Sequence, residues 1–299
     1  MPIERWGSLS VADHIDTGAL AINVMLYDRL VMPVLTEQPD RAERPYWEAR
    51  GWDPDLQEKR LQTLGDLVVK RPWDAALRHR FRDRWAQLQA ERGDAQEIDA
   101  LHLTRRILAQ EKVRDKPRGV PHVEVIAAYN SSQALAEEFR LGEAADGPLA
   151  TQAVLVARRL AVPAYAKAES TLAAAIELSR DRSFRAKRRA LFDWQLQMAQ
   201  RGVAPADALE LLCEKTEAYN AEVRAANRKV HLRWAFAVCG MGLGFARGEP
   251  LIAGASAMLS LVQFATLDRQ PAIEPGDAAP AAMFHDIAAR TPLKLVPRR

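Results

Sequence analysis

Two short runs decide the fold class: Asp28-Arg-Leu-Val-Met-Pro-Val-Leu35 and Asp66-Leu-Val-Val-Lys-Arg-Pro-Trp73. Each run is mostly apolar, and each contains a proline near its end. Proline has no backbone N–H to give to a sheet, so it suits an edge strand or the end of a strand. We therefore predict a β-strand in each run, with Pro33 at an edge or at a strand end.

Helical patterns alternate with these strands. Asp53 followed by Pro54 is typical of a helix start, and Gly65 is typical of a helix end. Strand and helix in succession favour an α/β layer with crossover connections. Helices are expected at about Thr17–Tyr27, Asp53–Leu64, Asp74–Glu91 and Gln133–Phe139, and further strands at His122–Tyr129 and Ala153–Ala164.

Beyond Pro163 the pattern becomes helical. Apolar residues recur at helical spacing over Ala166–Arg201, and again from Leu209 after a turn at Ala204-Pro205. This predicts an αα-hairpin, whose second helix continues toward Phe245. The predicted fold is a small open α/β layer followed by a mainly helical C-terminal half. Its domains are an α/β domain over 1–165, a helical domain over 166–268 and a loosely ordered tail over 269–299 with a short helix at Ala281–Arg290.

An unusually apolar pair of segments lies near the C-terminus. Trp234–Phe245 offers about 12 uncharged residues and Leu251–Leu267 about 17, against the roughly 20 that a membrane-spanning helix needs. Gly240 and Gly244 have the spacing that lets two helices approach closely. The first interpretation is a helical hairpin buried within the protein. Membrane association and a ligand pocket are the alternatives.

Composition narrows the class of protein. Among 299 residues the hydrophobic fraction is 48% and the charged fraction 27%, which indicates a globular chain. The formal net charge of +3 is too small to favour a nucleic-acid surface. Two cysteines, Cys213 and Cys239, give no disulfide framework, and no secretory signal is visible at the N-terminus. We therefore expect a cytoplasmic protein.

Acidic residues of the α/β half are the candidate catalytic groups, because carboxylates at strand ends can bind metals or transfer protons. Asp28 and Asp66 precede strands, whereas ligands bind beyond the carboxyl ends of parallel strands, so capping or turn roles compete with catalysis. Asn130 is equally suited to begin a helix. The candidates are Asp28, Asp66, Glu124 and Asn130.

The densest positive stretch runs from Arg180 to Arg189. On a helix, Arg182, Arg185 and Arg189 share one face, which could contact phosphate, an acidic partner or anionic lipid headgroups. The competing interpretation is a solvated face balanced by Asp181 and Asp193.

Cofactor motifs are weak throughout. Six histidines show no zinc-ligand spacing, and the glycines from Gly240 to Gly244 lack the dinucleotide-binding pattern. His14, between Asp13 and Asp16, could act as a base, but we expect it to face solvent from a loop. No cofactor and no metal are predicted.

Four short segments resemble stretches of uncharacterised bacterial proteins over about the first quarter of the chain. The resemblance implies no activity. The segments are Trp6-Gly-Ser-Leu-Ser10, Leu26-Tyr-Asp-Arg-Leu30, Gly51-Trp-Asp-Pro54 and Pro72-Trp-Asp74.

Three functional hypotheses follow from the sequence. The first is a non-catalytic interaction or regulatory protein with a protein partner or self-association. The second is a membrane-engaging effector that uses residues 230–268. The third is a metal- or phosphate-dependent hydrolase that uses the acidic residues of the α/β half, so the sequence leaves enzymatic activity undecided.

Overall fold

A computed structural model gives the fold. It describes residues 3–35, 53–93, 97–112, 116, 118, 122–128, 160–161, 167–204, 207–208, 210–225 and 278–295. The expected helix at Gln133–Phe139 and the apolar segments between 230 and 268 lie outside the described residues. Among the helices that are described, none combines the length and the apolar character needed to cross a membrane.

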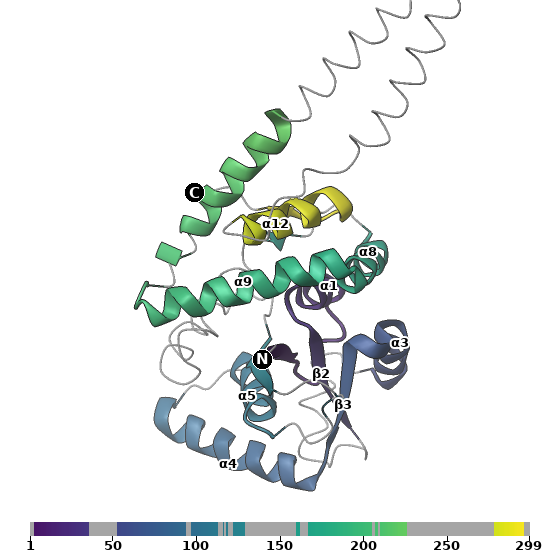
Figure 1. Cartoon of the computed structure of the whole chain (residues 1–299). Helices are drawn as coiled ribbons and strands as arrows, with labels where there is room; N and C mark the ends of the chain where they lie inside the picture. The colour runs from purple at the N-terminus through teal and green to yellow at the C-terminus, as the bar shows by residue number, and fades with distance from the viewer. Residues whose placement is uncertain are drawn as a thin grey trace, which may run out of the picture.

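The described elements form a small sheet with helices on both sides (Figure 1). In chain order they are β1 (Ile3–Ser8), α1 (Thr17–Leu26), β2 (Arg29–Leu35), α3 (Pro54–Leu64), the 3-10 turn η1 (Gly65–Leu67), β3 (Val68–Trp73), α4 (Ala75–Arg92), α5 (Glu97–Ala109), β4 (His122–Ala127), β5 (Leu160–Ala161), α8 (Ala168–Arg180), α9 (Arg182–Gln200), α12 (Ala279–Arg290) and β6 (Lys294–Leu295). Residues 210–225 are also helical.

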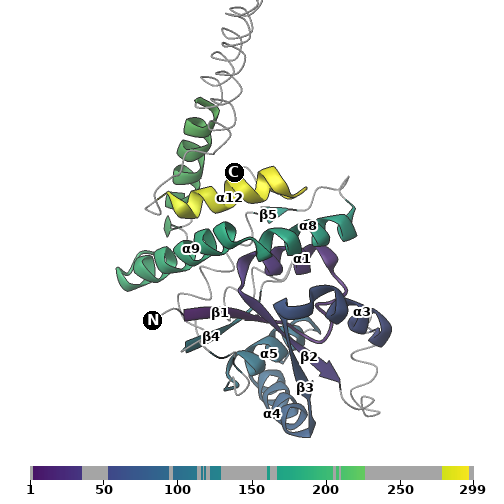
Figure 2. The same ribbon diagram turned by 45° about the vertical axis from the view of Figure 1, so that its right-hand side comes forward.

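The main sheet has four parallel strands in the order β3-β2-β1-β4. This confirms the predicted open α/β layer with a mainly helical remainder. The chain passes from β1 to β2 on one side and returns to place β4 on the other. The topological switch point therefore lies between β1 and β4. In open α/β sheets, ligands bind at the carboxyl ends of the two strands at this point. Figure 2 shows α8 and α9 on one side of the sheet and α4 and α5 on the other.

Strand β2 lies inside the sheet, so Pro33 is not on an edge strand; it lies near the end of β2, which is the other position expected for it. The physical reason lies in the register. Pairing with β1 ends at Ser8 and Val31, while pairing with β3 continues to Leu35 and Trp73. Pro33 therefore lies where β2 has only one neighbouring strand, and its missing N–H is tolerated there.

The predicted helix boundaries of α3 and α4 are confirmed by their capping contacts. The Asp53 carboxylate accepts hydrogen bonds from the backbone N–H groups of Asp55 and Leu56 at 3.0 and 3.2 Å. Asp74 caps α4 in the same way. Gly65 ends α3 with a φ of 55°, a conformation that glycine adopts without strain. Short-range chemistry thus places these ends correctly.

The single helix expected over Ala166–Arg201 is two helices, α8 and α9, which meet at Asp181. Asp181 has an extended backbone, and its carboxylate accepts hydrogen bonds from the N–H groups of Ser183 and Phe184. A capping residue of this kind starts a new helix. The apolar spacing runs almost unbroken across the joint, so the periodicity concealed the break.

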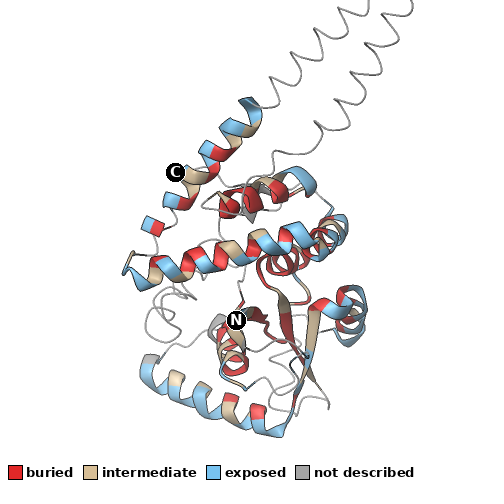
Figure 3. Ribbon diagram, in the orientation of Figure 1, coloured by how far each residue is buried: buried red, intermediate tan, exposed pale blue. Residues whose placement is uncertain are grey.

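The largest buried cluster joins the sheet to the helical layer. It includes residues of α1, β2, α8, α9 and α12, and nearly all of α1 is buried (Figure 3). Tyr27 follows α1 and packs on Phe192 of α9, with ring centroids 6.4 Å apart. Gly7 makes room for this ring, since a Cβ there would approach it to 2.6 Å. The domain limits drawn from the sequence remain predictions.

The C-terminal residues 278–295 are built into the fold, which differs from the loosely ordered tail expected there. The expected short helix is present as α12, and its side chains from Ala279 to Phe284 are buried against the neighbouring helices. Strand β6 then pairs antiparallel with β5. Prolines and alanines, which suggested disorder in the sequence, here supply a slim helix that packs closely.

Candidate functional site

Two of the acidic candidates lie around one arginine, Arg5 of β1. The backbone N–H of Arg5 donates to the Asp28 carboxylate at 3.0 Å. Its side-chain Nε donates to the Glu124 carboxylate at 2.9 Å. Arg5 is buried, and its guanidinium also lies over the ring of Phe192. Asp28 and Glu124 thus share a structural partner.

Asp28 has a second partner, Arg188 of α9. The Arg188 Nε and Nη2 donate to one oxygen of Asp28 at 3.2 and 2.8 Å, and Nη1 donates to the Ser179 hydroxyl at 2.9 Å. Burial lowers the pKa of Arg188, and the Asp28 carboxylate opposes that shift. Asp28 therefore neutralises a charge that is 1% exposed.

The other acidic candidates do not join this pair. Asp66 lies before β3 and pairs at 3.0 Å with Arg180, and both side chains are at least half exposed. Asn130 lies outside the described residues. Asp28 and Glu124 lie at or near the amino-terminal ends of their strands, whereas parallel sheets bind ligands beyond the carboxyl ends. Within the described chain, no group of three or more acidic, histidine or cysteine side chains could hold a metal ion.

The basic candidates lie on the outer face of α9. Arg182, Arg185 and Arg189 are all exposed. Among the described residues none of the three has an ion-pair partner. We call these three residues the α9 arginine face. It begins at the first residue of the helix, whose first turn contains no acidic side chain.

Asp181, which the solvated-face interpretation requires to balance these arginines, has other partners. Asp181 caps α9 with one oxygen and accepts a hydrogen bond from Arg290 with the other, at 2.8 Å. These contacts hold the pKa of Asp181 below its ordinary value, the Arg290 hydrogen bond being the largest cause. The positive end of the helix dipole adds to the three arginines. Asp193 is exposed one turn after Arg189, so three arginines face one carboxylate and the net charge of this side of α9 is positive.

A polar cluster at the carboxyl end of β1 was missed by the sequence analysis. Arg105 of α5 is fully buried and donates two hydrogen bonds to Asp13, at 2.8 and 2.5 Å. The Ser10 N–H donates to the same carboxylate at 2.6 Å. Helix α5 itself was not predicted. Its buried positions Ala100, Thr104, Ile107 and Leu108 have helical spacing, which is the signal that could have found it.

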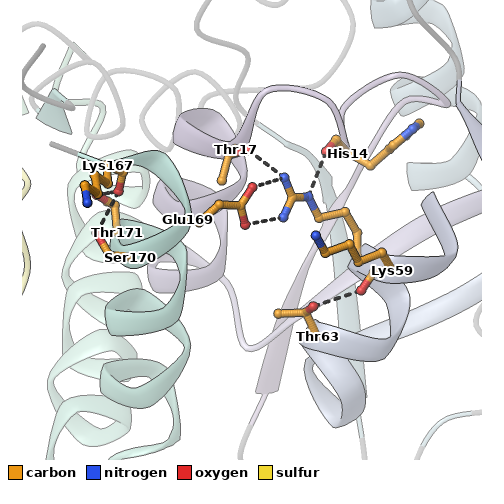
Figure 4. A network of polar contacts seen from close by, with 9 residues as sticks. His14, Thr17, Lys59, Thr63, Lys167, Glu169, Ser170 and Thr171 are labelled. Carbon is orange, nitrogen blue, oxygen red and sulfur yellow. Dashed lines mark hydrogen bonds and ion pairs between the residues drawn. The ribbon is translucent and has the colours of Figure 1, made fainter. Parts of the chain in front are cut away.

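Arg60 of α3 forms a second cluster, and its partners His14, Thr17 and Glu169 are labelled in Figure 4. Its Nε donates to the His14 carbonyl at 3.3 Å, and its Nη2 donates to the Thr17 hydroxyl at 2.8 Å. Nη1 and Nη2 each donate to the Glu169 carboxylate at 2.7 Å. The Arg60 side chain is 3% exposed and that of Glu169 is 64% exposed. One buried guanidinium thus joins α3, the β1–α1 loop and α8.

His14 is fully buried, so the expectation that it faces solvent is wrong. Its Nδ1 lies 2.9 Å from the Val11 carbonyl oxygen and its Nε2 lies 3.2 Å from the Asp53 carbonyl oxygen. A neutral ring can donate to only one of these two acceptors. Burial lowers the pKa of His14, while the two carbonyls and the carboxylates of Asp13 and Asp53 oppose the shift. The folded protein therefore favours the neutral ring.

Removing Asp28 is expected to destabilise the fold strongly. In Asp28→Ala, Arg188 stays buried without its carboxylate, which costs about 3–5 kcal/mol of unfolding free energy. Urea denaturation followed by circular dichroism measures this. The control is Arg185→Ala, which lies three residues before Arg188 on the exposed face of α9. It should change the free energy of unfolding by less than about 0.5 kcal/mol. Equal effects of the two substitutions would contradict the structural role of the buried pair.

His14 is expected to make stability depend on pH. Because its pKa is lower folded than unfolded, the unfolded chain binds the extra proton first, and stability falls as pH drops below about 6.5. Stability continues to fall until the pH is below the pKa of His14 in the folded protein. Urea denaturation at pH 7.5, 6.5 and 5.5 should show a shallower pH dependence for His14→Gln than for the wild type. His79→Gln, at an exposed site, should keep the wild-type dependence. A wild-type slope in His14→Gln would count against this assignment.

No model of a known protein family matches the chain, and neither a curated protein nor a solved structure matches it. The resemblance of the N-terminal segments to uncharacterised bacterial proteins therefore remains a prediction. The function has to be argued from the described residues.

Proposed function

We propose that this chain is a non-catalytic interaction protein, active in the cytoplasm, that binds the acidic surface of a partner protein through the α9 arginine face. The observation that carries the proposal is the exposure of Arg182, Arg185 and Arg189 without an ion-pair partner among the described residues. Arg182 and Arg185 lie in or next to the first turn, where a positive side chain opposes the helix dipole, so the stability of α9 gives no reason for these two.

The buried side of the same helix supports this role. Arg188 is fixed to Asp28, and Lys187 pairs with Asp286 of α12 at 2.5 Å. Helix α9 is therefore anchored both to Asp28, which precedes β2, and to α12. Its outer arginines project from a fixed backbone. A binding surface that is ordered in advance loses less entropy when its partner docks.

The hydrolase hypothesis has less support from the described residues. Asp28 and Glu124 accept hydrogen bonds from buried arginines and lie at the amino-terminal side of the sheet. A carboxylate held in this way stabilises packing, and it would have to leave its arginine to bind a metal or take a proton.

The α9 arginine face can be tested with labelled poly-L-glutamate as a model acidic surface. Replacing Arg182, Arg185 and Arg189 by Ala should weaken binding about three- to 150-fold in low salt, because each of the three exposed ion pairs contributes about 0.2–1 kcal/mol. Fluorescence anisotropy measures the dissociation constant. The control replaces the exposed Lys70, Arg84 and Arg224 by Ala, which removes the same total charge. Equal weakening by the two triple variants would reject a localised face.

A second candidate function is membrane engagement through residues 230–268. The supporting observation is the uncharged run Leu251–Leu267, and the α9 arginine face could contact anionic headgroups. A hydrophobic segment and a basic surface together give the two signals that stable membrane attachment requires.

Vesicle flotation separates this candidate from the first. If the segment inserts, the protein should float with phosphatidylglycerol vesicles, and Leu259→Asp should weaken partitioning on the order of a hundredfold, because a charge at the centre of an inserted segment costs about 3 kcal/mol. Leu211→Asp, at a side chain already 41% exposed, is the control and should float like the wild type. Wild-type protein that stays in the unfloated fraction would reject membrane engagement.

A further inference from the structure

The helix of residues 210–225 carries a row of exposed carboxylates. Glu210, Glu214 and Glu217 are all exposed, and their spacing places them on one side of the helix. We call these three residues the 210–217 acidic face. Leu211 lies beside them with its side chain 41% exposed, so a contact made on this face would also cover apolar area.

The opposite side of this helix is packed against α12. Tyr219 is buried there, and its ring lies against that of His285 of α12, with centroids 5.6 Å apart. The same helix α12 holds α9 through the ion pair between Asp286 and Lys187. The α9 arginine face and the 210–217 acidic face therefore both project from helices that are anchored to α12.

The two faces have matching lengths and matching steps. Along the chain, the arginines are separated by three and then four residues, and the glutamates by four and then three. At a rise of 1.5 Å per residue, each row is about 10.5 Å long. When two such helices lie antiparallel, the order of the steps in one of them is reversed, so every arginine lies opposite a carboxylate. The pairs are Arg182 with Glu217, Arg185 with Glu214, and Arg189 with Glu210.

Within one chain the two faces do not meet. Helix α9 continues for eleven residues after Arg189 and ends at Gln200, which is about 16 Å further along its axis. The 210–225 helix then runs away from that end of α9 (Figure 1). Both faces remain exposed. Carboxylates that pair with the arginines must therefore come from another molecule.

We propose that the acidic partner of the α9 arginine face is the 210–217 acidic face of a second copy of this chain. The inference rests on the proposed function, because it names the partner of the same face. Complementary charges fix the orientation of two surfaces and speed their encounter more than they add affinity. The self-association is therefore weak, and it is sensitive to salt.

Two complementary variants test this contact. One replaces the three arginines of the α9 arginine face by Ala, and the other replaces the three glutamates of the 210–217 acidic face by Gln. Sedimentation equilibrium in low salt should show a wild-type mass that rises with concentration. Each variant should associate about three- to 150-fold more weakly, which is the range for three exposed ion pairs. An equimolar mixture should regain association, because it contains one intact face of each kind.

The controls remove the same charges elsewhere on the exposed surface and should associate like the wild type. One replaces Lys70, Arg84 and Lys112 by Ala, and the other replaces Glu58, Glu91 and Glu177 by Gln. A wild type that is monomeric at every concentration would overturn the inference, and so would a mixture no more associated than its separate components. The proposed function would survive either result if the α9 arginine face still binds poly-L-glutamate.

Discussion

The buried ion pair between Arg188 and Asp28 is the constraint on which the rest of the structure depends. Arg188 comes from α9, and Asp28 precedes the central strand β2, so this contact joins the helical layer to the sheet. A guanidinium that is 1% exposed is tolerated only if its donors are satisfied. Asp28 and Ser179 satisfy most of them, and this fixes the position of α9 along the sheet.

The same chemistry recurs at the opposite end of the sheet, with a difference in exposure. Arg105 is paired with Asp13, which is itself nearly buried, so that contact serves the fold alone. Arg60 is paired with Glu169, which faces solvent. A buried pair is expensive to separate because it leaves an uncompensated charge, whereas an exposed carboxylate regains water when it leaves. Separating the second pair nevertheless leaves the buried Arg60 charge uncompensated, so both arginines are held in the fold by their carboxylates.

Local chemistry made part of this structure predictable. The runs before Leu35 and Trp73 form strands, and Asp53 caps its helix, because these outcomes depend on neighbouring residues. Strand β1 was not predicted. Its short segment has no clear alternation, and it becomes central only through pairing with β2 and β4. The α9 arginines were located by spacing alone, whereas the ion-pair partners of Asp28 and Arg60, which are Arg188 and Glu169, lie more than 100 residues away in the chain.

Helix α8 connects the Arg60 cluster to helix α9. Its first turn supplies Glu169 to the Arg60 cluster, and its last residue adjoins Asp181, which caps α9. Ser179 near its end holds the Arg188 guanidinium from which α9 is anchored. One continuous helix therefore fixes Glu169 against Arg60 and ends next to the residue from which α9 starts.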